Sequence, residues 1–277
     1  MHRLSPSAKI LVFNNFLANL KLLAVDNSQS LQRGIWVTLG NRLVIATAAV
    51  LVAVVLFAAF YALTLPEQNT LYQVSPFNVL AAGNFEGNTT YSELAKHGDF
   101  GIGTLNDLNG EMIAINGKFY QIPTDGAPRE IGSSEETPYA TITFFSSDYT
   151  FQVANVSSYS QLALEINSTL PNYNAIYAIK VHGFFSFAET RSVSIQTKPY
   201  PTLWDAVENQ TVFNLNDVSA TAVGFFFPDS MNGVDYVGYH LHLLTDNYSA
   251  GGHLLECTIE SATVEIDQIN NYRLLIP

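Results

Sequence analysis

Three histidines that lie close together in the sequence most constrain the fold of this chain. The stretch "VGYHLHLLTDNYSAGGHLLE", residues 237–256, contains His240, His242 and His253. A β-strand directs alternate side chains to the same face, so His240 and His242 are expected to lie side by side. The polar, glycine-rich segment "TDNYSAGG" predicts a turn, and "HLLECTIE" then resumes a strand pattern. A β-hairpin of this kind can place His253 opposite His242.

Three imidazoles on one face of a sheet predict a metal site. A catalytic zinc site uses three protein ligands and keeps a fourth position open for water or substrate. One strand histidine is usually an ordinary polar residue, but three are costly to bury without a shared partner. The single cysteine, Cys257, cannot build a thiolate cage and is expected in the core. We therefore predict a Zn²⁺ ion held by His240, His242 and His253.

A long apolar run precedes the rest of the chain. Residues 43–65, "LVIATAAVLVAVVLFAAFYALTL", carry no charge, and a helix of this length can cross a hydrocarbon layer of about 30 Å. The run therefore predicts one transmembrane helix. Five basic residues and one acidic residue come before it, so the positive-inside rule predicts a cytoplasmic tail over 1–42. The protein is then expected to be membrane-anchored, with residues 66–277 on the extracytoplasmic side.

Charge and strand patterns describe residues 66–277 further. The net charge of −12 and the pI near 4.7 exclude a nucleic-acid partner, which needs basic stripes. "EMIAINGKFYQI" predicts a β-hairpin with an Asn-Gly turn. Strand patterns recur in "TPYATITFF", "AIYAIKVHGFFSFAETRSV", "TAVGFFFP" and "ATVEIDQI", whereas only "YSELAKHG" and "SYSQLALEINSTL" read as helices. We expect an α+β fold with mainly antiparallel strand pairing.

Several blocks of sequence together resemble the α-acetolactate decarboxylase family. They are residues 71–126, "ETRSVSIQTKPYPTL", "NQTVFNL", "ATAVGFFFP" and "GYHLHLLTDNYSAGGHLLE". The resemblance spans residues 71–277 and excludes the apolar run. It implies an α+β fold of two β-sheet subdomains, one mixed and one mainly antiparallel, with few helices.

The resemblance also implies a reaction and a set of site residues. The reaction is the zinc-dependent decarboxylation of 2-acetolactate to acetoin and CO₂ through a metal-stabilised enediolate. The family's zinc ligands fall on the three histidines, its essential arginine on Arg191, a site glutamate on Glu111, and a pocket threonine on Thr104. The family continues into a tail that returns a second glutamate to the zinc. No residue of this chain, which stops at Pro277, takes that role.

Without the resemblance, the residues leave other interpretations open. Arg191 reads as a surface strand residue, Glu111 as a charge at the start of a hairpin, and His97 and His182 as residues without a metal. The histidine spacing also suits a cupin-like or carbonic-anhydrase-like metalloprotein. A membrane-anchored zinc sensor that has lost catalysis is a further alternative. 2-Acetolactate is the expected small-molecule partner, and a homodimer remains open.

Overall fold

The computed structural model describes residues 36–64 and 69–276 of the chain. The chain divides into two compact units, Met1–Leu65 and Pro66–Pro277, and each is treated by itself. In the first unit, helix α2 runs over Trp36–Thr64, and its side chains are described over 44–60. The predicted cytoplasmic tail, 1–42, lies outside the described residues except for the start of this helix.

The prediction of a transmembrane helix over 43–65 is corrected by the structure. No helix in the described part of the chain is both long enough and apolar enough to cross a membrane. The predicted membrane anchoring and the extracytoplasmic location of the main domain, which depended on that helix, are corrected with it.

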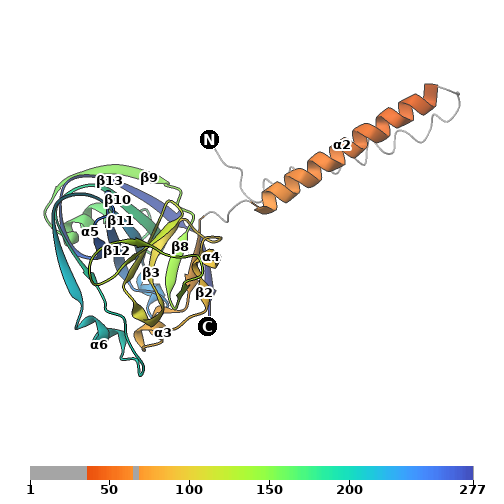
Figure 1. Cartoon of the computed structure of the whole chain (residues 1–277). Helices are drawn as coiled ribbons and strands as arrows, with labels where there is room; N and C mark the ends of the chain where they lie inside the picture. The colour runs from red at the N-terminus through yellow and green to blue at the C-terminus, as the bar shows by residue number, and fades with distance from the viewer. Residues whose placement is uncertain (1–35, 65–68, 277) are drawn as a thin grey trace. The chain divides into compact units, whose positions relative to one another are not determined.

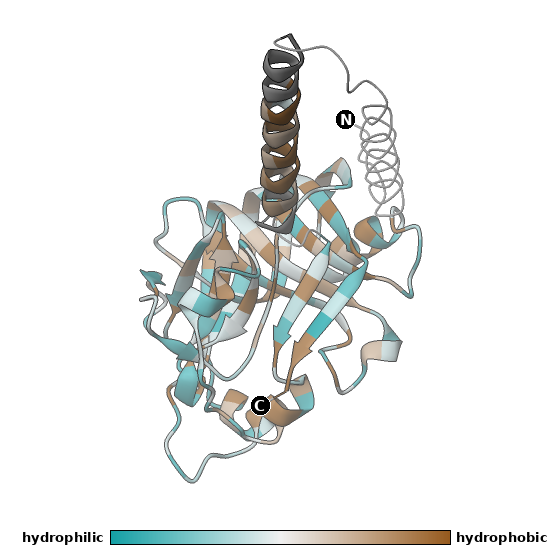
Figure 2. Ribbon diagram, turned by 90° about the vertical axis from the view of Figure 1, so that its right-hand side faces the viewer, coloured by the Kyte–Doolittle hydropathy of each residue, from teal (hydrophilic) through white to brown (hydrophobic). Residues whose placement is uncertain are grey.

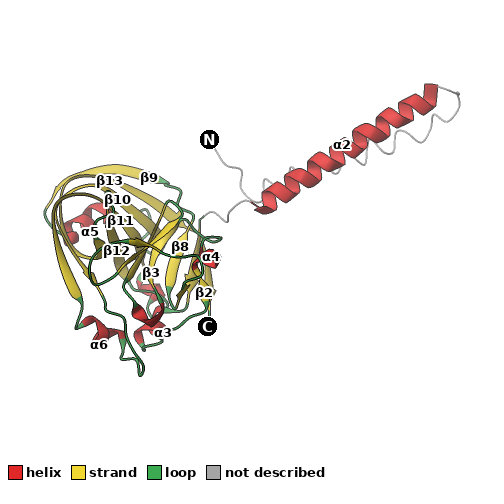
Figure 3. Cartoon of the chain, in the orientation of Figure 1, coloured by secondary structure: helices red, strands yellow, loops and turns green. Residues whose placement is uncertain are grey.

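The second unit contains two large sheets, which Figure 3 shows in yellow. The first is mixed, with the strand order β14-β1-β8-β3-β4-β5-β6. Only the β1–β14 pair in it is parallel. Its strands are β1 (Thr70–Val74), β3 (Phe100–Thr104), β4 (Glu111–Ile115), β5 (Lys118–Ile122), β6 (Arg129–Glu130), β8 (Ala140–Thr143) and β14 (Asn271–Leu275).

The second sheet is antiparallel throughout and curls on itself. Its order is β10-β11-β12-β13-β9, and β10 also pairs with β13, which joins strands that are not neighbours in that order (Figure 1). Its strands are β9 (Tyr149–Val156), β10 (Ile176–Ser192), β11 (Thr211–Phe227), β12 (Gly238–Thr245) and β13 (Gly251–Ile269). A small additional pair joins β2 (Thr89–Thr90) to β7 (Glu136–Thr137).

The helices of this unit are short. They are α3 (Phe77–Ala81), α4 (Tyr91–Leu94), α5 (Tyr159–Asn167), α6 (Leu203–Val207) and the 3₁₀ turns η2 (Asn106–Leu108) and η3 (Asp229–Met231). Ser158 caps the start of α5, since its side chain accepts a hydrogen bond from the Gln161 N–H at 3.1 Å, and the helix buries Leu162 and Ile166. Both segments predicted as helices, around α4 and α5, contain one.

The predicted Asn-Gly hairpin is confirmed. β4 and β5 pair antiparallel around Asn116 and Gly117, which have φ values of 53° and 76°. Two successive positive φ values are the conformation of a type I′ turn, whose twist matches that of the paired strands. This turn sets the register that places Glu111 at the far end of the hairpin, opposite Ile122.

A shared apolar core holds the two sheets together. Phe100, Ile102 and Ile113 of the mixed sheet form one buried cluster with Val223 and Phe225 of the antiparallel sheet. Figure 2 shows apolar and polar residues alternating along the strands, which is the period expected where one face is buried. The unit has the expected α+β character, with one mixed sheet, one antiparallel sheet and few helices. Packing the sheets face to face brings β4 close to β12, β11 and β13.

Candidate active site and metal centre

The three histidines converge as the hairpin pattern predicted. β12 and β13 pair antiparallel, with His242 directly opposite His253, and His240 lies two residues earlier on β12. The centroids of the three imidazole rings are 4.9–5.2 Å apart. One candidate ligand atom from each histidine lies within 4.8 Å of the others. This cluster can hold a metal ion.

The hydrogen bonding of the histidines fits a metal. The Nδ1 of His242 lies 2.9 Å from the carbonyl oxygen of Met112, which can only accept, so Nδ1 carries the proton and Nε2 presents a lone pair. His240 Nδ1, His242 Nε2 and His253 Nδ1 are all buried without a hydrogen-bond partner among the described residues. Buried ring nitrogens without hydrogen-bond partners, on three neighbouring histidines, fit a bound metal ion.

Burial also keeps the imidazoles in the form that binds metals. Desolvation lowers the pKa of His242 to about 3, and Arg191 adds to the effect by charge repulsion. The pKa values of His240 and His253 are held well below the ordinary range, again chiefly by burial. Neutral imidazole is the ligand form of histidine, so the cluster needs no deprotonation at neutral pH.

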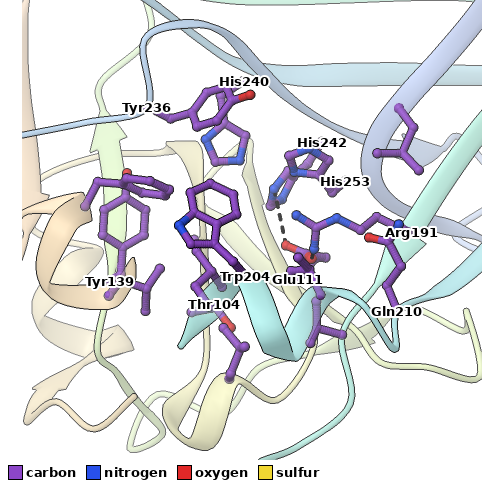
Figure 4. A pocket seen from close by; sticks show the side chains of 18 residues that line it. Thr104, Glu111, Tyr139, Arg191, Trp204, Gln210, Tyr236, His240, His242 and His253 are labelled. Carbon is purple, nitrogen blue, oxygen red and sulfur yellow. Dashed lines mark hydrogen bonds and ion pairs between the residues drawn. The ribbon is translucent and has the colours of Figure 1, made fainter. Parts of the chain in front are cut away.

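Arg191 lies in the same row of the antiparallel sheet as two of the histidines. It is opposite His253 in the β10–β13 pairing, just as His253 is opposite His242. Directly opposed residues of antiparallel strands project to the same face, so the guanidinium enters the pocket beside the imidazoles (Figure 4). Its side chain is 15% exposed, which argues against an ordinary surface residue.

Glu111 reaches this group from the mixed sheet. One carboxylate oxygen accepts a hydrogen bond from Arg191 Nη1, and the other lies 3.4 Å from His242 Nε2. Figure 4 shows the carboxylate between the guanidinium and the imidazole. Burial raises the pKa of Glu111, and the positive charge of Arg191 opposes that shift. The carboxyl group therefore links the two sheets within the pocket.

The backbone around His253 is closely packed. Gly252 has a φ of +136°, a conformation that residues with a side chain rarely adopt. A Cβ atom there would lie 2.5 Å from the carbonyl oxygen of Arg191. Glycine thus lets β13 approach β10 closely enough to set His253 beside Arg191.

Thr104 also lines the pocket, but its hydroxyl group is engaged. It is buried, pairs with Glu111 in the β3–β4 register, and donates a hydrogen bond to the carbonyl oxygen of Gly110 at 2.7 Å. The side chain therefore fixes the chain reversal that leads into Glu111.

The remaining wall of the pocket is mainly apolar. The cavity has a volume of about 170 Å³, below the roughly 300 Å³ at which pockets for drug-sized ligands begin. Trp204 of α6 and Tyr236 lie at its edge, with 55% and 41% of their surface exposed. The other apolar lining residues are Phe77, Leu80, Leu108, Tyr139, Val193, Leu203, Val207 and Leu255. A small substrate with one polar end and one apolar end fits such a cavity.

Three residues considered in the sequence lie outside this site. His97 stacks on Tyr72 with ring centroids 4.0 Å apart. His182 lies 3.7 Å from a carboxylate oxygen of Asp246. Cys257 is buried and free, in agreement with its predicted place in the core.

No sequence pattern indicated the aromatic side of the pocket. Phe77, Tyr139, Trp204 and Tyr236 come from four separate segments, and no spacing or residue pattern connects them. Only Tyr236, four residues before His240, is close enough in the chain to be suspected of belonging to the site. The polar residue Gln210, beside Arg191 in Figure 4, lies in the block "NQTVFNL" but was not assigned to the site.

The fold and the pocket define a class of protein: a two-sheet α+β enzyme with a candidate metal centre of three histidines. A family model described as alpha-acetolactate decarboxylase matches residues 71–277. The chain belongs to the α-acetolactate decarboxylase family. The family resemblance and the enzyme class inferred from the sequence are therefore confirmed, and the enzyme is a decarboxylase.

The matches to similar proteins extend over most of the length of those proteins. The alpha-acetolactate decarboxylase of Methanosarcina mazei is 43% identical over 209 residues, which are 76% of this chain and 73% of that protein. That of Bacillus subtilis is 39% identical over 207 residues, covering 75% and 81%. The crystal structure of the alpha-acetolactate decarboxylase from Bacillus subtilis strain 168 aligns with a TM-score of 0.73, covering 75% of this chain and 89% of that one.

Proposed function

We propose that residues 66–277 form a catalytic domain that converts 2-acetolactate to acetoin and CO₂ with the help of zinc. Family membership supports the reaction. The observation that carries the zinc dependence is the convergence of three buried histidine nitrogens without hydrogen-bond partners among the described residues. His240, His242 and His253 are the proposed ligands. Bound there, zinc would act as a Lewis acid toward the oxygen atoms of the substrate.

Arg191 is proposed to bind and orient the substrate. When the bond to the carboxylate carbon breaks, its electron pair moves toward the neighbouring ketone, whose oxygen gains negative charge. A planar guanidinium can donate two parallel hydrogen bonds to such oxygens. Glu111 holds Arg191 through one nitrogen, so the group is already oriented before the substrate arrives.

Glu111 is proposed to handle the proton that the reaction consumes. Loss of CO₂ leaves a carbon that must be protonated to give acetoin. Because burial raises the pKa of Glu111, its carboxyl group retains a proton at higher pH than an exposed glutamate does. Thr104 is proposed to support this role, since its bond to Gly110 fixes the backbone that leads into Glu111.

One experiment tests the proposal as a whole. The purified protein is expected to contain one zinc ion per chain and to release acetoin from 2-acetolactate. Removal of the metal with a chelator should abolish acetoin formation, and added Zn²⁺ should restore it. A protein that binds zinc but forms no acetoin would instead be a zinc-binding module without catalysis. A protein that forms acetoin equally well without metal would contradict the proposed role of zinc.

A further inference from the structure

A buried carboxylate lies behind the aromatic wall of the pocket, outside the proposed catalytic group. Asp235 is 2% exposed, and the described residues offer it no ion pair. Its Oδ1 accepts hydrogen bonds from the Tyr139 hydroxyl at 2.7 Å and from the Tyr236 N–H at 2.6 Å. Its Oδ2 accepts one from the Thr141 hydroxyl at 3.1 Å. Burying a carboxyl group is costly, so three hydrogen bonds at one residue indicate a specific role.

The contacts of Asp235 join the two sheets. Thr141 belongs to β8 of the mixed sheet and Tyr139 directly precedes it, whereas Asp235 belongs to the connection between β11 and β12. The next residue back, Val234, is fixed to the mixed sheet as well. Its carbonyl oxygen accepts from the Phe77 N–H at 2.8 Å and from Gln73 Nε2 at 2.7 Å. The connection that enters β12 is therefore attached at two successive residues.

This attachment leads directly to the first candidate metal ligand. Tyr236, bonded to Asp235 through its N–H, places its ring edge-on to the His240 imidazole with the centroids 5.5 Å apart (Figure 4). Phe77 packs against Tyr236 in turn, with the two ring centroids 5.8 Å apart.

His240 depends on this packing more than His242 does. The His242 ring is oriented by its hydrogen bond to the Met112 carbonyl oxygen. The buried Nδ1 of His240 has no hydrogen-bond partner among the described residues. The orientation of the His240 ring is therefore set by its neighbours, and Tyr236 is the neighbour that the connection holds in place.

We infer that Asp235 is a positioning residue for the metal centre: it fixes Tyr236 against His240 and so sets the ring for metal binding. This inference rests on the proposed zinc site. Groups that orient metal ligands without touching the metal typically contribute about 10- to 100-fold to metal affinity. The Asp235 carboxylate acts through a packed ring rather than through a hydrogen bond to the imidazole, so an effect near 10-fold is expected.

The test measures Zn²⁺ affinity by competition with a chromogenic chelator, using the full-length protein. Asp235→Asn keeps the shape of the side chain but removes one acceptor oxygen and the negative charge, so the bond from the Thr141 hydroxyl group must reverse its direction. It is expected to weaken zinc binding about 10-fold and to shift the visible absorption of the Co²⁺-loaded protein. Asp229→Asn is the matched control, because Asp229 is an exposed aspartate of the same connection. Its zinc affinity should remain within about twofold of the parent.

A second pair of variants tests the same inference without altering the buried carboxylate. Tyr236→Ala removes the ring that packs on His240 and should weaken zinc binding as Asp235→Asn does, whereas Tyr236→Phe keeps the ring and should retain the affinity. These variants decide the matter if Asp235→Asn does not fold. The inference is overturned if Tyr236→Ala and any folded Asp235→Asn bind zinc like the parent, or if Asp229→Asn is weakened equally. A parent protein that binds no zinc would instead overturn the proposed function.

Discussion

The antiparallel sheet and the mixed sheet build one pocket in different ways. The antiparallel sheet supplies His242, His253 and Arg191 as a single row across three adjacent strands. The mixed sheet supplies Glu111 and the Met112 carbonyl group, which reach that row only because the sheets pack face to face. The proposed ligand set is thus largely a product of local strand pairing. The proposed proton-handling group depends on long-range packing.

Removing a histidine from the antiparallel sheet is the most direct test of this difference between the two sheets. His242→Ala should eliminate stoichiometric zinc and lower acetoin formation about 1,000-fold, since a Lewis acid contributes roughly 4 kcal/mol to such a reaction. Elemental analysis and an acetoin assay provide the two measurements. His97→Ala is the control, because His97 stacks on Tyr72 outside the pocket. Zinc retained by His242→Ala with parental affinity would contradict the assignment of this ligand.

Glu111→Gln tests the contribution of the mixed sheet. The substitution keeps the shape and removes the ionisable group, so kcat should fall roughly 300-fold, a typical value for one proton-transfer group. Zinc content should be unchanged, which would separate the functions of the two sheets. Glu130→Gln, at an exposed glutamate paired with Lys118, controls for the loss of charge. If Glu111→Gln lost its zinc instead, Glu111 would belong with the ligand set.

Arg191→Lys separates substrate binding from metal binding within the antiparallel sheet itself. Lysine keeps the positive charge but lacks the planar fork, so kcat should fall about 100-fold, equivalent to roughly 3 kcal/mol for one oriented donor. The zinc content should match that of the parent. Arg129→Lys, in a surface ion pair with Asp125, is the control. A loss of less than about fivefold would remove Arg191 from the proposed mechanism.

Asp235, whose hydrogen bonds join the two sheets, should make the free energy of unfolding depend on pH. Burial raises the pKa of Asp235 to about 7, from an ordinary value of 3.8. Because its pKa is raised in the folded state, the protonated Asp235 carboxyl group contributes fully to stability below about pH 3.8. This contribution is lost as pH rises through 7. The free energy of unfolding of the parent relative to Asp235→Asn should fall by on the order of 2 kcal/mol between about pH 4 and 5.5. Chemical denaturation at both pH values checks this, and equal falls in the two proteins would contradict it.

The smallest effect is expected at the edge of the pocket. Trp204 packs edge-on against Phe77 with the ring centroids 6.2 Å apart and is more than half exposed. Trp204→Ala should raise KM about fivefold, corresponding to about 1 kcal/mol for one aromatic contact, and leave zinc content unchanged. Leu164→Ala, an exposed apolar residue of α5 away from the pocket, is the control. A large fall in kcat would assign Trp204 a role beyond substrate binding.

The parts of the fold and site that the sequence predicted are those that depend on nearby residues. The Asn116-Gly117 hairpin and the opposition of His242 and His253 follow from turn chemistry and strand alternation over short distances. Arg191 and Glu111 could be assigned only through the family resemblance, because they lie 80 residues apart and meet through sheet packing.

Other features had no local signal. Tyr139 and Asp235 are 96 residues apart, and neither belongs to a recognisable motif. The transmembrane prediction was wrong for a different reason. It rested on the length of an uncharged apolar run, but no helix in the described part of the chain is long and apolar enough to cross a membrane. Hydropathy alone thus gave a topology that the structure corrects.

The parallel pairing of β1 with β14 has a consequence for how the protein is made. Thr70 pairs with Asn271, about 200 residues further along the chain, and the Ser75 N–H donates to the carbonyl oxygen of Leu275. A contact between such distant segments forms slowly, because a long loop must close first. During translation, β1 is therefore exposed as an open strand edge until β14 has left the ribosome, and open edges pair readily with other chains. The nascent domain is therefore prone to aggregation at this unpaired edge from the synthesis of β1 until that of β14.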